Sequence, residues 1–279
     1  MFSFIIPGFN GSAALKNTLS SLAWQTQKIA FEVILVDNNS NRENLDRLYL
    51  EFQDKLNLYL IKQPRLKTTY ALCRARNLGL SIARYEWIIT LDSDIVLPPT
   101  YLESLAQYVA GQEKLILTGE RIFIKRSQIE PLSPENLLNT TPIASSSNYN
   151  QVEDRRLPFL KQLESVSHPW AFFHGCNTVF RRVEGLVVGG FDEEYDGNWG
   201  YEDIDFAYRL IVTGACQPIY LPAIYCYHQE EEEMPEFIDR FDKSSNPNWA
   251  KICRVIPGYQ AFKTSHYGSL ANCQIKLDD

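Results

Sequence analysis

The chain of 279 residues is long enough for one large α/β domain, or for one such domain with an appendage. Hydrophobic residues make up 45% and charged residues 22% of it, which is ordinary for a globular protein. The net charge of −7 argues against a general nucleic-acid surface, and the absence of a run of about 18 apolar residues argues against a membrane span.

The first residues and the cysteines favour a cytoplasmic protein. Residues 1–7 lack a basic n-region and predict a first strand rather than a signal peptide. The sequence has no Cys-x-x-Cys pair, which argues against a zinc knuckle or a redox motif. Peripheral contact with the inner face of the membrane is left open. Reduced and mostly buried thiols are expected in the apolar stretches that carry Cys73, Cys176, Cys216 and Cys226.

The first 118 residues alternate between strand and helix patterns. Continuous apolar runs predict buried strands, and apolar residues at helical spacing predict amphipathic helices between them. The strands are expected at 2–7, 31–36, 56–61, 85–91 and 114–118. The helices are expected around 15–23, 45–52, 71–82 and 98–109, with Gly111 at the end of the last. This alternation predicts a mostly parallel sheet with helices on both faces.

The remaining chain is less regular. Residues 126–165 contain four prolines and a polar run, which predicts a long loop with short helical pieces. Regular structure is expected to resume with a strand at 170–181, a helix at 204–211 and short strands near 217–221 and 223–228. The run of glutamates from Glu230 to Glu233 is interpreted as a solvated segment.

Two aspartates separated by one small residue follow the expected strand at 85–91. Asp92-Ser93-Asp94 stands at its C-terminal end, where open α/β sheets bind ligands. Aspartate oxygens suit magnesium or manganese, and a metal held there could bridge to the phosphates of a nucleotide. Any surface turn can carry such a pair, so the motif gains weight only from the segments around it.

Three further segments are expected at the same edge of the sheet. They are Ile5-Ile6-Pro7-Gly8-Phe9-Asn10, Ile34-Leu35-Val36-Asp37-Asn38-Asn39-Ser40 and Arg74-Ala75-Arg76-Asn77-Leu78-Gly79. Together with Leu91-Asp92-Ser93-Asp94, they resemble the nucleotide-sugar-binding half of the family-2 glycosyltransferases, which have the GT-A fold. The resemblance implies that a nucleotide sugar is bound by Pro7, Phe9, Asn10, Asp37, Arg76, Asp92 and Ser93.

These residues also have plainer readings. Asp37 can accept the N3–H of uracil, but it could merely cap the next helix. Arg76 can donate to a base carbonyl or a phosphate, but it could be a surface cation. No Gly-x-Gly-x-x-Gly follows the first strand and no Gly-Lys-Ser/Thr loop exists, so the dinucleotide and P-loop classes lack their signature.

A second motif surrounds the start of the helix expected at 204–211. Gly189-Gly190-Phe191-Asp192-Glu193 precedes Asn198-Trp199-Gly200-Tyr201-Glu202-Asp203-Ile204-Asp205. This looks like the Gly-Gly-Phe-Asp-Glu and Trp-Gly-x-Glu-Asp motifs of galactosyltransferase-like and N-acetylgalactosaminyltransferase-like GT-A enzymes, which are inverting. Asn198 replaces the usual glycine. The resemblance implies that Asp203 is the catalytic base and that Glu202 binds the acceptor or positions the base.

The chemistry of an inverting transfer needs such a carboxylate. The acceptor hydroxyl must lose its proton as the new bond forms, opposite the leaving diphosphate. The plainer reading is that Glu202, Asp203 and Asp205 only cap the helix, and Asp205 is expected to pair with Arg209. Trp199 offers a flat face for a sugar ring, although it could equally belong to the core. Core positions are expected for Trp170, Phe172 and Phe173.

A histidine completes the expected metal site. His228 ends the segment 224–228, and in metal-dependent GT-A enzymes a histidine from this region often joins the metal ligands. The resemblance therefore implies manganese or magnesium held by Asp94 and His228, with Asp92 contacting the metal or the ribose. His174 falls in the segment that usually lines the donor-sugar pocket of the family.

The sequence therefore predicts an α/β protein with a GT-A domain at 1–229 and a C-terminal extension at 230–279 that packs on it. A Rossmann-like nucleotide-binding half is expected at about 1–119 and an acceptor half at about 166–229. The expected function is inverting, metal-dependent transfer of a sugar from a UDP-sugar to a hydroxyl of a glycan, lipid-linked or small-molecule acceptor, as in polysaccharide or glycoconjugate synthesis. Galactose or N-acetylgalactosamine is favoured, and glucose and N-acetylglucosamine stay open.

Two other functions remain as alternatives. One is a nucleotide-sugar-binding protein without turnover. The other is a sugar-phosphate nucleotidyltransferase, which would need a glycine-rich loop with an arginine after the first strand. Gly8-Phe9-Asn10-Gly11-Ser12 is not such a loop.

Overall fold

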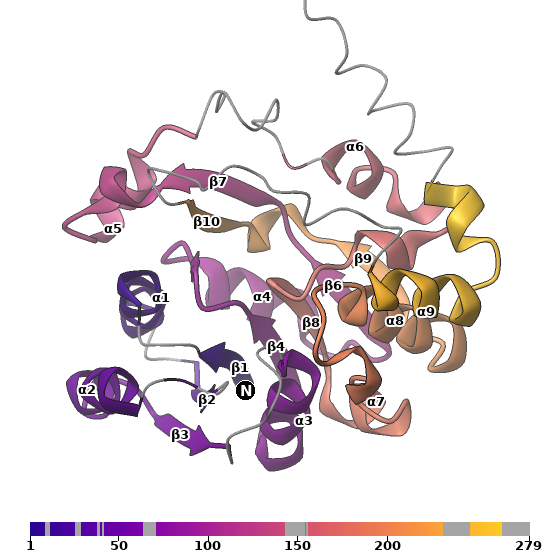
Figure 1. Ribbon diagram of the computed structural model, residues 1–279. Helices are drawn as coiled ribbons and strands as arrows, with labels where there is room; N and C mark the ends of the chain where they lie inside the picture. The colour runs from indigo at the N-terminus through magenta and orange to yellow at the C-terminus, as the bar shows by residue number, and fades with distance from the viewer. Residues whose placement is uncertain are drawn as a thin grey trace, which may run out of the picture.

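The computed structural model describes residues 1–8, 12–25, 29–37, 40, 42–63, 71–142, 154, 156–230 and 246–263. These residues form a seven-stranded sheet and a three-stranded sheet (Figure 1). Within the large sheet, β8 runs antiparallel to both of its neighbours and every other pair is parallel. In spatial order its strands are β3 (Leu58–Lys62), β2 (Phe31–Asp37), β1 (Phe2–Gly8), β4 (Trp87–Leu91), β8 (Asn177–Arg181), β6 (Leu115–Thr118) and β9 (Gln217–Tyr220).

The order of the first four strands fixes where a ligand can bind. The chain runs outward from β1 to β2 and β3, then returns to place β4 on the other side of β1. Ligands of open α/β sheets bind at such a switch point, beyond the carboxyl ends of the strands. Gly8 pairs with Asp37 at that edge, and Asp92 follows β4 directly.

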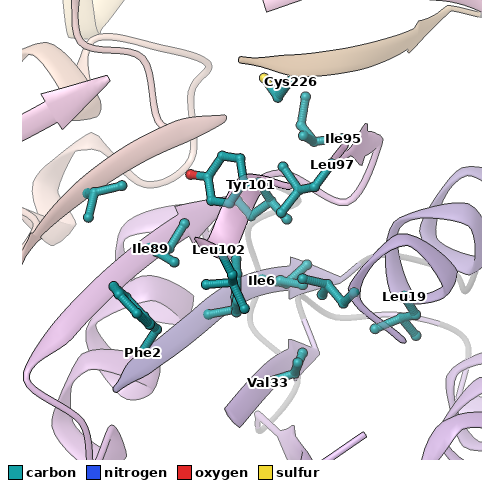
Figure 2. Close-up of a cluster of buried hydrophobic side chains, with 14 of the residues drawn as sticks. Phe2, Ile6, Leu19, Val33, Ile89, Ile95, Leu97, Tyr101, Leu102 and Cys226 are labelled. Atoms are coloured by element: carbon teal, nitrogen blue, oxygen red, sulfur yellow. The ribbon is translucent and has the colours of Figure 1, made fainter. Parts of the chain in front are cut away.

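Helices cover both faces of this sheet, so its strands are apolar on both sides. Along β1, Phe2, Phe4 and Ile6 enter one core and Ile5 enters the other. The first core lies under α1 (Ala13–Ala23), α2 (Arg42–Phe52) and α4 (Tyr101–Val109), and Figure 2 shows part of it. The other face carries α3 (Leu72–Ile82), α7 (Arg182–Val187), α8 (Glu202–Tyr208) and α9 (Pro247–Val255).

The small sheet lies beside the switch point. β10 (Cys226–Glu230) lies between β5 (Ile95–Val96) and β7 (Arg121–Lys125), antiparallel to the first and parallel to the second. The sequence pattern did not predict β7, because its five residues alternate too briefly to be distinguished from the loop that follows. Its partner is also about a hundred positions away, so local pattern carries no sign of the pairing.

The strand expected at 170–181 is wrong in its first half. Residues Pro169–Phe172 form a 3₁₀ turn, η3, and β8 begins only at Asn177. The aromatic residues of this turn are buried in the second core, so a run of core side chains imitated a strand. The expected core positions of Trp170, Phe172 and Phe173 are confirmed.

The described part of residues 126–165 contains short helical pieces, as expected. No helix in the described ranges is both long and apolar enough to cross a bilayer. α8 continues as a π turn, η5, and ends at Gly214, and α9 lies alongside α8 (Figure 1). Within residues 126–165 the pieces are η1 (Arg126–Ile129), α5 (Pro134–Leu138), α6 (Leu157–Leu160) and η2 (Leu163–Ser165). Outside that range lie η4 (Glu193–Tyr195), η5 (Arg209–Thr213) and η6 (Pro222–Ile224).

The cysteines follow the expectation of buried thiols. Cys73, Cys176, Cys216 and Cys226 are buried, and Cys253 is half-buried. All five are free thiols.

Candidate active site

A buried arginine joins the two acidic motifs. Arg76 on α3 is 2% exposed; its Nη1 donates to Glu202 Oε1 at 2.9 Å and its Nη2 donates to Asp92 Oδ1 at 3.1 Å. The surface-cation reading of Arg76 is therefore wrong. Its contact with a nucleotide stays a prediction. Glu202 and Asp92 are 110 positions apart, and one guanidinium brings their motifs to a common site.

A glycine makes room for this arginine. A Cβ at Gly175 would lie 2.3 Å from Arg76 Nη2, which is closer than atoms can approach. The backbone N–H of Gly175 donates to Asp203 Oδ2 at 3.1 Å. One residue without a side chain therefore packs against the arginine and orients the candidate base.

Asp203 has an unusual protonation equilibrium. Burial and the charge of Glu202 raise the pKa of Asp203 to about 7, against the lowering effect of Arg76 and of two backbone N–H groups. Its Oδ1 accepts the N–H of Ile204 at 2.8 Å, so part of its role is local to the helix start. A half-buried carboxyl group with this pKa can accept a proton near neutral pH.

Asp94 and His228 meet across the small sheet. β10 pairs His228 with Ile95, so His228 Nε2 lies 3.5 Å from Asp94 Oδ2. His228 Nδ1 lies 3.0 Å from Glu230 Oε1. Burial lowers the pKa of His228, but the two carboxylates outweigh it and raise that pKa to about 9.

The residues at this point fit a divalent metal in part. The Oδ1 atom of Asp94 is buried and has no hydrogen-bond partner among the described residues. A buried oxygen without a partner can bind a cation. A cation could replace the proton between Asp94 and His228. The described residues contain no group of three or more metal-ligating side chains close enough to share one ion, so water or substrate oxygens would have to complete the coordination. Asp92 lies nearby, and burial raises its pKa despite Arg76.

The other nucleotide-binding predictions lie at the same edge. Asp37 ends β2 and is 5% exposed, and its Oδ1 accepts the N–H of Ser40 at 2.8 Å, so one of its oxygens is already bound to backbone. Pro7 is buried in β1 opposite Val36, and the carbonyl of Ser93 accepts Thr18 Oγ1 at 2.9 Å. Phe9 and Asn10 lie outside the described residues.

Residues 196–201 form the loop that leads into α8. Trp199 is 45% exposed, so its core reading is wrong, and stacking on a sugar stays a prediction. Gly200 and Tyr201 have φ of +86° and +74°, which turns the chain into the helix and accounts for the glycine of the motif. The acidic residues that follow are brought to the site by this turn.

Two residues outside the recognised sequence motifs hold this loop in place. Asp196 accepts the N–H groups of Cys73 at 2.9 Å and Arg74 at 3.1 Å, which fixes the loop to the start of α3. Asn248 on α9 is 1% exposed, and its Nδ2 donates to the carbonyls of Tyr195 at 2.9 Å and Gly200 at 3.0 Å. Both contacts join distant parts of the chain, so local sequence gave no signal for them.

Side chains from α3 and from the end of α8 bind the backbone of the Gly-Gly-Phe motif. Asn77 Oδ1 accepts the N–H of Phe191 at 2.7 Å, and its Nδ2 donates to the carbonyl of the same residue at 2.8 Å. Arg209 donates to the carbonyl of Gly190 at 2.6 Å and pairs with Asp205 at 2.6 Å, as the i,i+4 spacing predicted. Asp205 is thereby committed to structure, and Asp203 is left facing Gly175.

Family models match most of this chain. The model described as "Glycosyl transferase family 2" matches residues 3–183, and "N-terminal domain of galactosyltransferase" matches residues 159–224. The chondroitin synthase of Escherichia coli is 32% identical over 251 residues, which cover 85% of this chain and 36% of that protein. Validoxylamine A glucosyltransferase of Streptomyces hygroscopicus subsp. jinggangensis is 30% identical, with 77% and 52% covered. The chain thus spans about a third to about a half of the length of these relatives.

Solved structures share the fold. S. aureus TarS in complex with UDP-GlcNAc gives a TM-score of 0.57 at 20% identity, covering 84% of this chain and 60% of that one. GalNAc-T7 with UDP, GalNAc and Mn²⁺ gives a TM-score of 0.65 at 18% identity, covering 99% and 52%. The expected GT-A fold is confirmed.

Proposed function

The chain belongs to glycosyltransferase family 2, and from that premise we propose that it transfers a sugar from a UDP-sugar to a hydroxyl group, with inversion and with a divalent metal. One observation carries this proposal. The buried guanidinium of Arg76 binds Asp92 and Glu202 at once, so the acidic pair after β4 and the acidic start of α8 belong to one site.

Asp203 is the proposed base. Its pKa of about 7 allows it to take the proton of the acceptor hydroxyl near neutral pH, and the N–H of Gly175 orients the carboxylate for that step. Glu202 is held by Arg76 and therefore keeps a fixed place beside the base. In this arrangement Glu202 contributes to the placement of the acceptor and to the raised pKa of Asp203.

Asp94 and His228 would hold manganese or magnesium, with Asp92 contacting the metal or the ribose. A metal bound there supplies charge neutralisation for the departing diphosphate. The buried Oδ1 of Asp94 supports this assignment because it has no hydrogen-bond partner among the described residues. Asp94→Ala should abolish turnover and weaken metal-dependent UDP binding, and full activity in excess chelator would contradict the assignment.

Two further assignments concern the nucleotide base of the donor and the sugar that is transferred. Asp37 at the end of β2 is proposed to accept the N3–H of uracil, which cytosine lacks. The galactosyltransferase match over residues 159–224 favours galactose or N-acetylgalactosamine, with glucose and N-acetylglucosamine next. A growing glycan is the favoured acceptor, because three of the relatives are named as chondroitin or hyaluronan synthases.

The test is release of UDP from a panel of UDP-sugars, with Mn²⁺ and with glycan and small-molecule hydroxyl acceptors. We expect acceptor-dependent release and a product whose anomeric configuration, read by NMR, is opposite to that of the donor. Calorimetry should show UDP binding far more tightly than GDP or CDP, since one charge-assisted hydrogen bond is worth about 1.5–3 kcal/mol. Tight UDP binding without any turnover would instead support a nucleotide-sugar-binding protein.

A further inference from the structure

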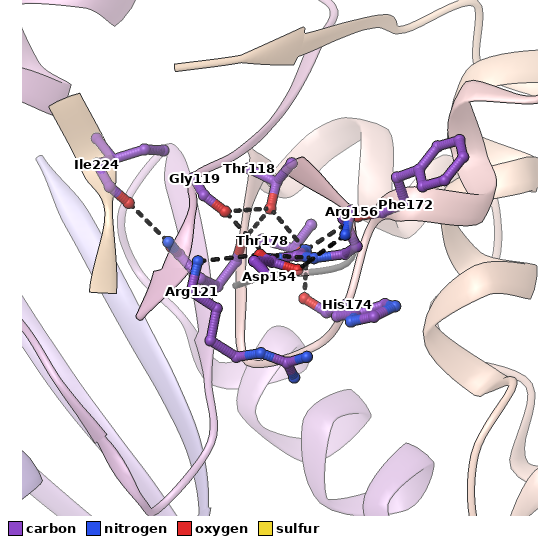
Figure 3. A network of polar contacts seen from close by, with 10 residues as sticks. Thr118, Gly119, Arg121, Asp154, Arg156, Phe172, His174, Thr178 and Ile224 are labelled. Atoms are coloured by element: carbon purple, nitrogen blue, oxygen red, sulfur yellow. Dashed lines mark hydrogen bonds and ion pairs between the residues drawn. The ribbon is translucent and has the colours of Figure 1, made fainter. Parts of the chain in front are cut away.

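A closed ion pair lies where β6 leads into β7 (Figure 3). Asp154 and Arg156 are both almost fully buried. The carboxylate of Asp154 accepts Arg156 Nη2 at 2.6 Å, Arg156 Nε at 2.9 Å and 3.0 Å, and the backbone N–H groups of Arg156 and Arg121 at 3.1 Å and 3.0 Å. Both oxygens of Asp154 are therefore fully used.

The guanidinium of Arg121 is not part of this pair. Arg121 is the first residue of β7, and Figure 3 shows its side chain pointing away from Asp154 and Arg156. Its guanidinium makes no hydrogen bond or ion pair with any described residue, and the Nε atom is buried without a partner among them. Its Cζ lies 4.6 Å from the ring centroid of Phe123, so stacking holds the cation in place.

The strand register brings this cation next to the candidate metal ligands. Phe123 pairs with His228 across β7 and β10, and their ring centroids are 5.3 Å apart. Arg121 and Phe123 are on the same face of β7, about 7 Å apart along the strand. The guanidinium therefore stands on the side of the small sheet that carries His228.

Three carboxylates on neighbouring elements already have other partners. Asp154 is bound to Arg156, while Asp94 and Glu230 flank His228. His174 is neutral, because burial and the positive charges of Arg156 and Arg121 hold its pKa well below the usual value. Among the residues that the structure describes, no carboxylate pairs with the guanidinium of Arg121, which places a positive charge at the edge of the proposed active site.

We propose that Arg121 binds an anionic oxygen group of the substrate at this edge. A guanidinium presents paired N–H donors that match a phosphate or a carboxylate equally well. The anion is therefore either the diphosphate of the UDP-sugar or the carboxylate of an acidic sugar in the acceptor. This inference rests on the proposed function, and it adds a substrate-binding residue from a strand that carries no recognised motif.

The test compares Arg121→Met and Arg121→Gln with Lys55→Met. Lys55 is the matched control because it also lies over an aromatic ring, 5.0 Å from the centroid of Phe52, but is exposed and outside the site. Calorimetry with Mn²⁺ measures the affinity for UDP and for uridine. Steady-state kinetics measures the KM for a carboxylated acceptor glycan and for its neutral counterpart. If Arg121→Met does not fold, the same measurements on Arg121→Gln decide the outcome.

The two sources of the anion give different results. If Arg121 binds the diphosphate, UDP affinity falls at least tenfold while uridine affinity is unchanged. If it binds an acceptor carboxylate, UDP affinity stays and KM rises at least tenfold for the carboxylated acceptor alone. Changes below twofold in both assays, in a folded variant, would overturn the inference. Wild-type protein that neither binds UDP nor releases it would instead refute the proposed function.

Discussion

The site depends on the missing side chain of Gly175. The position admits no Cβ beside Arg76, and its N–H binds the candidate base. Gly175→Ala should therefore displace the guanidinium and cost about 1–3 kcal/mol of stability, the usual cost of overpacking. Urea unfolding checks this value. An unchanged midpoint would show that Arg76 can move aside without loss.

Asp203 should carry the proton transfer. Asp203→Asn keeps the shape of the side chain and removes the proton acceptor, so turnover should fall by about 10²–10⁴. UDP affinity should stay within twofold, because the nucleotide contacts are expected at the ends of β1, β2 and β4. Turnover and calorimetry together decide the outcome. Loss of both activities would mean that the residue only supports the start of α8.

The pH dependence of the reaction should report the same group. The base must be deprotonated, so kcat/KM should rise through a pKa near 7 and fall about tenfold for each pH unit below it. Metal-saturated assays from pH 5.5 to 9 would measure this limb. A flat profile across pH 7 would assign the base to another group.

The stability of the folded protein should fall as pH rises, whereas kcat/KM should increase. The folded protein keeps the proton of Asp203 up to about pH 7, whereas the unfolded chain loses it near 3.8, so this group's contribution falls as pH rises through that window. Asp203→Asn should thus be more stable than wild type at pH 8, by up to about 4 kcal/mol, because folding raises the pKa of Asp203 by about three units. The difference should vanish near pH 3.5, and unfolding at both pH values measures it.

At the scale of elements, α9 holds the loop in front of α8. Asn248 ties Tyr195 to Gly200, and Lys251 on the same helix lies 2.6 Å from Asp192 and 2.7 Å from Glu194. A helix that lies outside every recognised motif in the sequence therefore fixes the backbone that presents Trp199.

Asn248→Ala should loosen that loop. It removes two buried hydrogen bonds and should cost about 1–3 kcal/mol of stability. Backbone amides of residues 197–201 should exchange faster with deuterium, and the acceptor KM should rise while UDP affinity is unchanged. Arg254→Ala is the control, since Arg254 lies on the same helix and is exposed. Equal exchange in the Asn248 variant and wild type would refute this role.

The elements differ in how far their sequence predicted them. Strands β1, β2 and β4 were predictable because both faces are buried and their apolar runs are continuous. β7 was not, because it is short and its partner is distant. The site divides in the same way: Asp92 and Asp203 stand in recognisable motifs, but the bridge through Arg76 and the contacts of Asn248 exist only after folding.

At the scale of the whole molecule, metal and nucleotide should bind together. The described residues supply only two close ligands, Asp94 and His228, so the diphosphate is expected to complete the coordination. UDP with Mn²⁺ should therefore raise the melting temperature by more than the sum of the two separate shifts. GDP with Mn²⁺ is the control. Additive shifts would indicate two independent sites.

Because β5 pairs with β10, the distance between Asp94 and His228 does not depend on the length of the chain between them. The register of two short strands sets that spacing, so loops between Val96 and Cys226 can lengthen or shorten without moving either side chain. One residue inserted within β10 would instead turn His228 to the opposite face. The length of the intervening chain can therefore change while the two side chains keep their places.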